Sequence, residues 1–108
     1  MSALQHVNDS NYAEVIEKGD KPALLDFGAT WCGPCKALEP TITALADEYG
    51  DRVAVSKLDI DEAPQTAQRF GIMAVPTVIL FKDGKEVHRF SGVQPKEKIA
   101  ELIQTHLL

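Results

Sequence analysis

Cys32 and Cys35 are the only cysteines in this 108-residue chain, and a glycine and a proline separate them. A disulfide across so short a loop removes little entropy from the unfolded chain, so a purely structural role accounts for it poorly. Reversible redox chemistry accounts for it better, because a CxxC pair near a strand-helix-strand pattern is typical of dithiol–disulfide exchange. The motif therefore predicts a redox-active centre.

The two cysteines are predicted to have unequal roles. Cys32 falls between a predicted strand at 23–29 and a predicted helix at 34–49. Unpaired amides and a partial positive charge at a helix start favour a thiolate, and they lower a cysteine pKa from its usual ~8.5. Cys32 is therefore predicted to be the nucleophile. Cys35 lies one turn further along the apolar helix face and is predicted to be the shielded, resolving thiol.

A zinc site and an inert core pair are the alternatives to redox chemistry at these cysteines. Zinc would need two more ligands, and only His6, His88 and His106 are available, none with ligand spacing. An inert pair is possible because free cysteine is often a small core residue. A tryptophan beside the pair and a Gly-Pro between its members are poor choices for core filling. Redox function is favoured and no metal is expected.

The remaining pattern predicts one α/β domain over 1–108, with the order β-α-β-α-β-α-β-β-α. Strands that alternate with helices pair in parallel, whereas the hairpin signalled by Asp83-Gly84 must be antiparallel. The result is a mixed sheet with helices on both faces. The predicted strands are 4–7, 23–29, 52–59, 77–82 and 86–91; the helices follow 8–10, span 34–49 and 63–70, and open at 94–95.

The composition limits the partners that the sequence predicts. Sixteen acidic residues against 11 basic ones give a net charge of −5, and no basic cluster stands out. Nucleic acid and anionic membranes are therefore not expected as partners. No apolar run approaches the roughly 20 residues needed to cross a bilayer, and the first residues carry no signal-like segment. A cytoplasmic location is expected, where a disulfide is usually transient and catalytic.

The segment Trp31–Lys36 resembles the active-site motif of the thioredoxin family. The similarity extends along the chain to Asp26–Phe27, Pro40, Lys57–Asp61, Val75–Thr77, Phe81–Gly84 and Gly92. The resemblance implies the thioredoxin fold, a five-stranded mixed β-sheet flanked by four helices. It also implies a protein-disulfide reductase that acts on client proteins as an electron carrier. A flavin-containing, NADPH-dependent thioredoxin reductase would recycle the chain, which would itself be a monomer with no bound cofactor.

The resemblance assigns roles in the cycle. The Cys32 thiolate attacks a client disulfide, and Cys35 then attacks Cys32, which releases the reduced client. Asp26 would accept the Cys35 proton, and its apolar neighbours agree, because a desolvated carboxylate has a raised pKa. The alternative is a solvent-facing aspartate at a strand end. Lys57 would moderate the Asp26 charge, unless it is an ordinary surface lysine.

The family also implies a docking surface around the motif. A cis Val75–Pro76 bond would face the sulfurs, and the Val75 backbone would pair with an extended client peptide. The alternatives are a trans proline, core-margin apolar residues and ordinary turn glycines. The predicted surface comprises Trp31, Gly33, Pro34, Ile60, Ile72, Met73, Ala74, Val75, Pro76, Gly92 and Val93.

Gly28 departs from the family, which usually has a large aromatic residue there, packed beneath the active site. Gly28→Trp is expected to fit and to stabilise the fold.

Two competing functions remain open on the sequence. One is a disulfide oxidant or isomerase, although Gly33-Pro34 resembles the reducing members. The other is a binding subunit in which the thiols are incidental.

Overall fold

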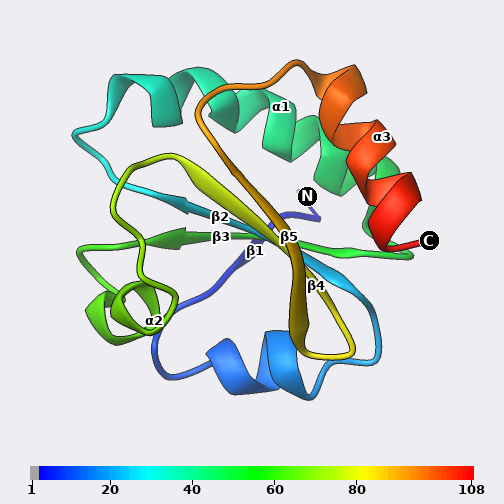
Figure 1. Ribbon diagram of the computed structural model, residues 1–108, viewed down its shortest axis with the longest axis horizontal. Helices are drawn as coiled ribbons and strands as arrows, with labels where there is room; N and C mark the ends of the chain where they lie inside the picture. Colours follow the sequence, from blue (N-terminus) through cyan, green and yellow to red (C-terminus); the bar gives the residue numbers. More distant parts are fainter. Residues whose placement is uncertain (1–2) are drawn as a thin grey trace.

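The computed structural model describes residues 3–108, which form one twisted five-stranded sheet between two layers of helices (Figure 1). The strand order is β1-β3-β2-β4-β5, which places β2 in the middle of the sheet. The strands are β1 (Gln5–His6), β2 (Ala23–Gly28), β3 (Ala54–Asp59), β4 (Thr77–Lys82) and β5 (Lys85–Ser91). The helices are the π-helix η1 (Ala13–Glu17) and the α-helices α1 (Gly33–Tyr49), α2 (Pro64–Arg69) and α3 (Lys96–His106).

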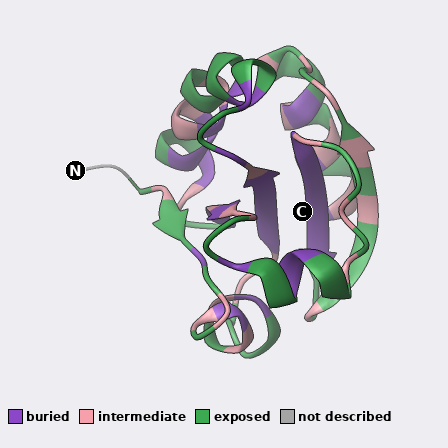
Figure 2. Cartoon of the chain, turned by 90° about the vertical axis from the view of Figure 1, so that its left-hand side faces the viewer, coloured by how far each residue is buried: buried purple, intermediate pink, exposed green. Residues whose placement is uncertain are grey.

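Each face of the sheet carries its own apolar core, because alternate strand residues point to opposite faces. Leu24 of β2 packs toward α1 and α3, in a cluster with Ile42, Ile99 and Ile103. Its neighbour Leu25 packs on the other face, in a cluster with residues around η1 and α2. The central strands are accordingly buried along their length, whereas β5 is largely exposed (Figure 2).

The predicted mixed sheet is confirmed, but one pairing differs from the prediction. β1 and β2 run parallel to β3, as strands alternating with helices should. β4 also follows a helix, yet it runs antiparallel to β2. The expectation of parallel pairing was therefore wrong for this strand: the short α2 and the segment after it return the chain along the opposite edge of β2 in the reverse direction.

The predicted hairpin is confirmed between β4 and β5. Asp83 and Gly84 have φ values of 54° and 78°, the left-handed pair that a tight two-residue turn requires.

Pro40 lies inside α1, which continues through it as one helix from Gly33 to Tyr49. Element boundaries differ from the predicted ones by one or two residues, except that the first helical segment is the short η1. None of the helices within residues 3–108 is long and apolar enough to cross a membrane.

Candidate redox site

Cys32 and Cys35 are joined by a disulfide at the start of α1. Cys32 is the N-cap residue in extended conformation, and its Sγ accepts a hydrogen bond of 3.1 Å from the Cys35 amide. Pro34 occupies the first turn, where a missing amide donor costs nothing. The helix start therefore directs an otherwise unpaired N–H at the Cys32 sulfur, and this contact favours the thiolate form once the disulfide opens.

The burial of the two cysteines is close to equal. Cys32 is 5% exposed and Cys35 is 9% exposed, so the predicted shielding of Cys35 is not reflected in a deeper position. Ala29 completes this small cluster, and Ile60 and Val75 pack against it. The two sulfurs thus differ less in depth than in what surrounds them.

Asp26 is a buried carboxyl in the central strand. It shares a sheet face with Leu24, the face that α1 covers, and only 7% of its surface is exposed. Its Oδ1 accepts no hydrogen bond from any described residue. Desolvation raises the pKa of Asp26 from 3.8 to about 7, partly opposed by the positive charge of Lys57 and reinforced by the negative charge of Glu39. The solvent-facing alternative for Asp26 is excluded.

Lys57 lies beside Asp26 because the two residues are paired in the register of β2 and β3. Its Nζ forms a 3.0 Å ion pair with Glu39 of α1, at the partly exposed rim of the site. Glu39 was not among the site residues predicted from the sequence. Its spacing of four residues from Cys35 was the available signal, because residues i and i+4 share one face of a helix.

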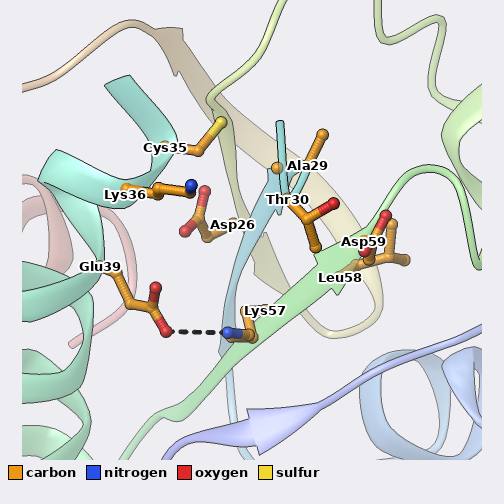
Figure 3. A pocket seen from close by; sticks show the side chains of 10 residues that line it. Asp26, Ala29, Thr30, Cys35, Lys36, Glu39, Lys57, Leu58 and Asp59 are labelled. Atoms are coloured by element: carbon orange, nitrogen blue, oxygen red, sulfur yellow. Dashed lines mark hydrogen bonds and ion pairs between the residues drawn. The ribbon is translucent and has the colours of Figure 1, made fainter. Parts of the chain in front are cut away.

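A cavity of about 320 Å³ lies beside Gly28, at the end of β2. The residues that line it come from β2, the link that follows it, β3 and the first half of α1, and Figure 3 shows Asp26, Cys35, Lys36 and Lys57 among them. A Cβ at Gly28 would lie 3.4 Å from both Cβ and Sγ of Cys35, which is van der Waals contact. The glycine therefore leaves space next to one sulfur of the disulfide.

The Val75–Pro76 peptide bond is cis, as predicted. The Val75 carbonyl oxygen lies 3.7 Å from Cys32 Sγ, so this loop does face the sulfurs. Around it the predicted docking residues fall into two groups. Exposed members are Trp31, Gly33, Pro34, Met73, Ala74 and Val93, and more covered ones are Ile60, Ile72, Val75, Pro76 and Gly92.

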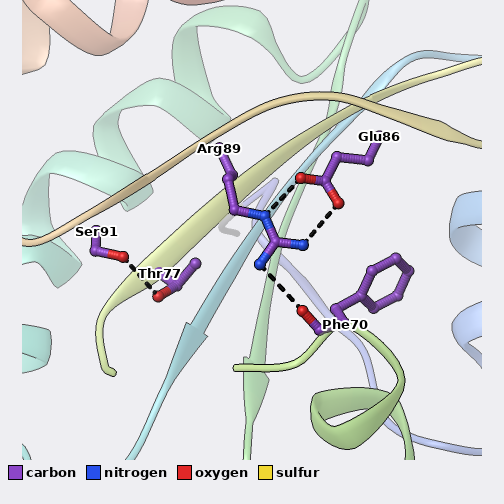
Figure 4. Close-up of polar contacts among 5 residues, drawn as sticks. All are labelled: Phe70, Thr77, Glu86, Arg89 and Ser91. Carbon is purple, nitrogen blue, oxygen red and sulfur yellow. Dashed lines mark hydrogen bonds and ion pairs between the residues drawn. The ribbon is translucent and has the colours of Figure 1, made fainter. Parts of the chain in front are cut away.

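Polar contacts between segments far apart in the chain hold this surface in shape. Trp31 Nε1 donates a 2.9 Å hydrogen bond to Asp61. Arg89 donates to the Phe70 carbonyl at 3.0 Å and to Glu86, and the hydroxyl oxygens of Thr77 and Ser91 lie 3.1 Å apart (Figure 4). Thr77 Oγ1 also donates to the Ala74 carbonyl at 2.6 Å. The loop that carries Met73 and Val75 is thereby tied at both ends to the hairpin.

A metal site is not evident in the described part of the chain. Within residues 3–108, no group of three His, Cys, Asp or Glu side chains lies close enough to hold an ion. His88 and His106 instead stack on each other, with ring centroids 4.6 Å apart, on β5 and α3. They belong to a different part of the molecule from the disulfide.

Comparisons with known proteins agree with this geometry. The family profile described as Thioredoxin matches residues 3–105. A thioredoxin of Staphylococcus haemolyticus is 49% identical over 105 residues, which cover 97% of this chain and 99% of the relative. A thioredoxin of Alicyclobacillus acidocaldarius is 46% identical over 97 residues, 90% of this chain and 91% of the relative. A thioredoxin of Staphylococcus aureus is 44% identical over 105 residues, 97% and 99% respectively.

We predict that Asp26→Asn stabilises the oxidised protein increasingly as the pH rises. The Asp26 pKa is raised to about 7 in the folded chain, so the unfolded chain ionises first and stability falls between about pH 4 and pH 7. Asparagine cannot ionise, so the stability of the variant relative to the wild type grows across this window by about 4 kcal/mol, using 1.36 kcal/mol per pKa unit. Urea unfolding at several pH values measures it. A difference that stays constant with pH would contradict the assignment.

Gly28→Trp is predicted to stabilise the fold by about 1–2 kcal/mol, because the ring would bury apolar surface in the neighbouring cavity. Gly28→Ala is the matched control. It adds only a Cβ at contact distance from Cys35, and should give a smaller gain from reduced freedom of the unfolded chain. Chemical denaturation of the three proteins provides the comparison. A tryptophan variant less stable than the alanine variant would show that the ring does not fit.

Proposed function

Because the chain belongs to the thioredoxin family, and is therefore a protein-disulfide reductase, we propose that Cys32 is its attacking sulfur and Cys35 its resolving sulfur. The observation that carries these roles is the hydrogen bond from the Cys35 amide to Cys32 Sγ at the N-terminus of α1. It favours negative charge on Cys32, and the described residues offer no comparable contact to Cys35. Cys32 is thus the better nucleophile and the better leaving group.

The proposed cycle uses both sulfurs in turn. In the reduced protein, the Cys32 thiolate attacks one sulfur of a client disulfide, and the other client sulfur leaves with the electron pair. Cys35 then attacks Cys32, which releases the second client sulfur and forms the Cys32–Cys35 disulfide. Two electrons move to the client in each turn.

Asp26 is proposed as the group that accepts the Cys35 proton. Its carboxyl and Cys35 line the same cavity, and its pKa of about 7 suits proton exchange near neutral pH. Lys57 is proposed to moderate the Asp26 charge, while Glu39 draws the lysine toward the rim of the site. The transfer is proposed to pass through water, because Asp26 Oδ1 accepts no hydrogen bond from the described residues and is free to accept one from a water molecule in the cavity.

The client is proposed to dock on the surface formed by Trp31, Gly33, Pro34, Ile60, Ile72, Met73, Ala74, Val75, Pro76, Gly92 and Val93. The Val75 backbone next to Cys32 would pair with an extended client segment, as an added strand does at a sheet edge. Exposed apolar side chains such as Trp31, Met73 and Val93 support this choice, since they offer apolar contact area to a partner.

Thioredoxins in general carry no cofactor, act on disulfide-containing clients and are recycled by a reductase. For this chain we propose that the recycling partner is a flavin-containing reductase that uses NADPH, and that the chain itself binds neither flavin nor NADPH. We further propose a monomer in the cytoplasm, where reducing conditions keep such a pair cycling. Nucleic acid is not proposed as a partner, because the net charge is −5.

Replacing each cysteine should separate the two proposed steps. Cys32→Ser is predicted to abolish NADPH-coupled insulin reduction, because the remaining sulfur, that of Cys35, lacks the amide contact that favours a thiolate and has no second cysteine to complete the cycle. Cys35→Ser is predicted to accumulate a mixed disulfide between Cys32 and the client, because the resolving attack is lost. Mass spectrometry of the intact adduct measures the second effect. Insulin reduction that persists in Cys32→Ser would overturn the assignment.

Asp26→Asn is predicted to slow client reduction near pH 7 by roughly a hundredfold, at the low end of what a positioned proton acceptor supplies. The wild-type rate should also depend on a group with a pKa of about 7 that the variant lacks. Stopped-flow fluorescence of Trp31, the only tryptophan, follows the reaction without background. Equal rates with equal pH dependence would rule out Asp26 as the acceptor.

A further inference from the structure

The cavity beside Gly28 reaches only one of the two sulfurs. Cys35 is among the described residues that line it, and Cys32 is not. A Cβ at Gly28 would already touch Cys35 Sγ at 3.4 Å, so the absence of a side chain there keeps this sulfur open. None of the proposed docking residues lines the cavity. The disulfide is therefore approached from two separate sides, Cys32 beside Val75 and Cys35 beside Gly28.

The cavity also contains a buried group that lacks a partner. Asp26 lines it with 7% of its surface exposed, and Asp26 Oδ1 accepts no hydrogen bond from the described residues. Buried polar atoms normally have a partner, so this oxygen is suited to a hydrogen-bond donor that enters the cavity. Thr30, Lys36 and Glu39 also line the cavity (Figure 3), and because these three residues are exposed, the cavity borders the solvent on their side.

Attack at Cys35 has a chemical advantage over attack at Cys32. Thiol–disulfide exchange is faster when the departing sulfur is the more stable thiolate. An attack on Cys35 releases Cys32, whose Sγ receives the Cys35 amide at the helix N-terminus. An attack on Cys32 would release Cys35, to which residues 3–108 offer no such contact. A thiol small enough to reach Cys35 therefore expels the better leaving group.

We propose that the cavity beside Gly28 is an exchange site for low-molecular-weight thiols, which attack Cys35 directly rather than Cys32. This inference rests on the proposed function only for the redox activity of the cysteine pair. The cavity is at the small end of the range for ligand pockets, so it admits a thiol of a few heavy atoms. A cysteine held on a folded client is too bulky and must use Cys32.

The exchange balances over two steps. The incoming thiol gives its proton to the Asp26 carboxylate and attacks Cys35 Sγ. The bond between the two sulfurs breaks, and its electron pair leaves on Cys32 as a thiolate. A second small thiol gives its proton, through solvent, to the Cys32 thiolate and attacks the small-molecule sulfur of the mixed disulfide. A small disulfide forms, and Cys35 leaves as a thiolate that recovers the first proton from Asp26. Two thiols are oxidised and one protein disulfide is reduced.

Single-cysteine variants test the route without ambiguity about which sulfur reacts. Reduced Cys32→Ser retains only Cys35 and is treated with oxidised 2-mercaptoethanol, the reverse of the second step. Mass spectrometry follows the mixed disulfide that forms on Cys35. We expect Cys35 to react in the folded protein, and Gly28→Trp in the same background to slow that reaction by about tenfold or more, because the ring blocks access.

The matched control uses Cys35→Ser, which retains only Cys32. Adding Gly28→Trp to this variant should change the Cys32 rate by less than about twofold, because the cavity does not reach that sulfur. Gly28→Leu serves as a second blocking variant, and circular dichroism confirms that each protein is folded. Slowing of Cys35 alone, by either folded blocking variant, supports the route.

Two results would overturn the proposal. One is a Cys35 that reacts only after unfolding in urea. The other is a Cys35 rate that neither blocking variant changes, or that falls in parallel with the Cys32 rate. Wild-type insulin reduction is measured separately, so a closed cavity would leave the proposed reductase function standing. If the wild type failed to reduce insulin while Cys35 still reacted through the cavity, the proposed reductase function would fail and the exchange site would stand.

Discussion

A carboxyl group buried without a hydrogen-bond partner among residues 3–108 is the constraint from which most of this site follows. Asp26 is placed in the middle strand of the sheet, under α1, where burial raises the free energy of its ionised form. A protein that only needed stability would have an apolar residue at this position. The chain keeps the carboxyl next to Cys35 instead, in a cavity that joins both groups to the solvent. Perturbed acids in such places are typical of functional sites.

The short link between β2 and α1 turns that constraint into a reactive centre. β2 ends at Gly28 and α1 begins at Gly33, so the buried carboxyl, the helix N-terminus and both sulfurs share one corner of the fold. The helix start acts on Cys32 through its amide, and the carboxyl acts on the Cys35 side. The near-equal burial of the two cysteines means that their different roles come from these contacts and not from depth.

The sequence predicted this corner well because its signals are local. The CxxC spacing, the apolar strand around Asp26 and the Asp83-Gly84 turn each follow from neighbours in the chain. The antiparallel β4, the Lys57–Glu39 pair and the tie between Arg89 and Phe70 depend on segments far apart in sequence. The cavity could not be derived either, because its volume depends on how β2, β3 and α1 pack around Gly28.

Titration of the Asp26 carboxyl carbon by nuclear magnetic resonance in the oxidised protein tests the buried acid without relying on enzyme kinetics. Asp26→Asn identifies the resonance by its disappearance. We expect a pKa of about 7, caused by desolvation and only partly opposed by Lys57. A pKa near the ordinary value of 3.8 would show that the carboxyl is hydrated or paired, and would contradict its role as the proton acceptor.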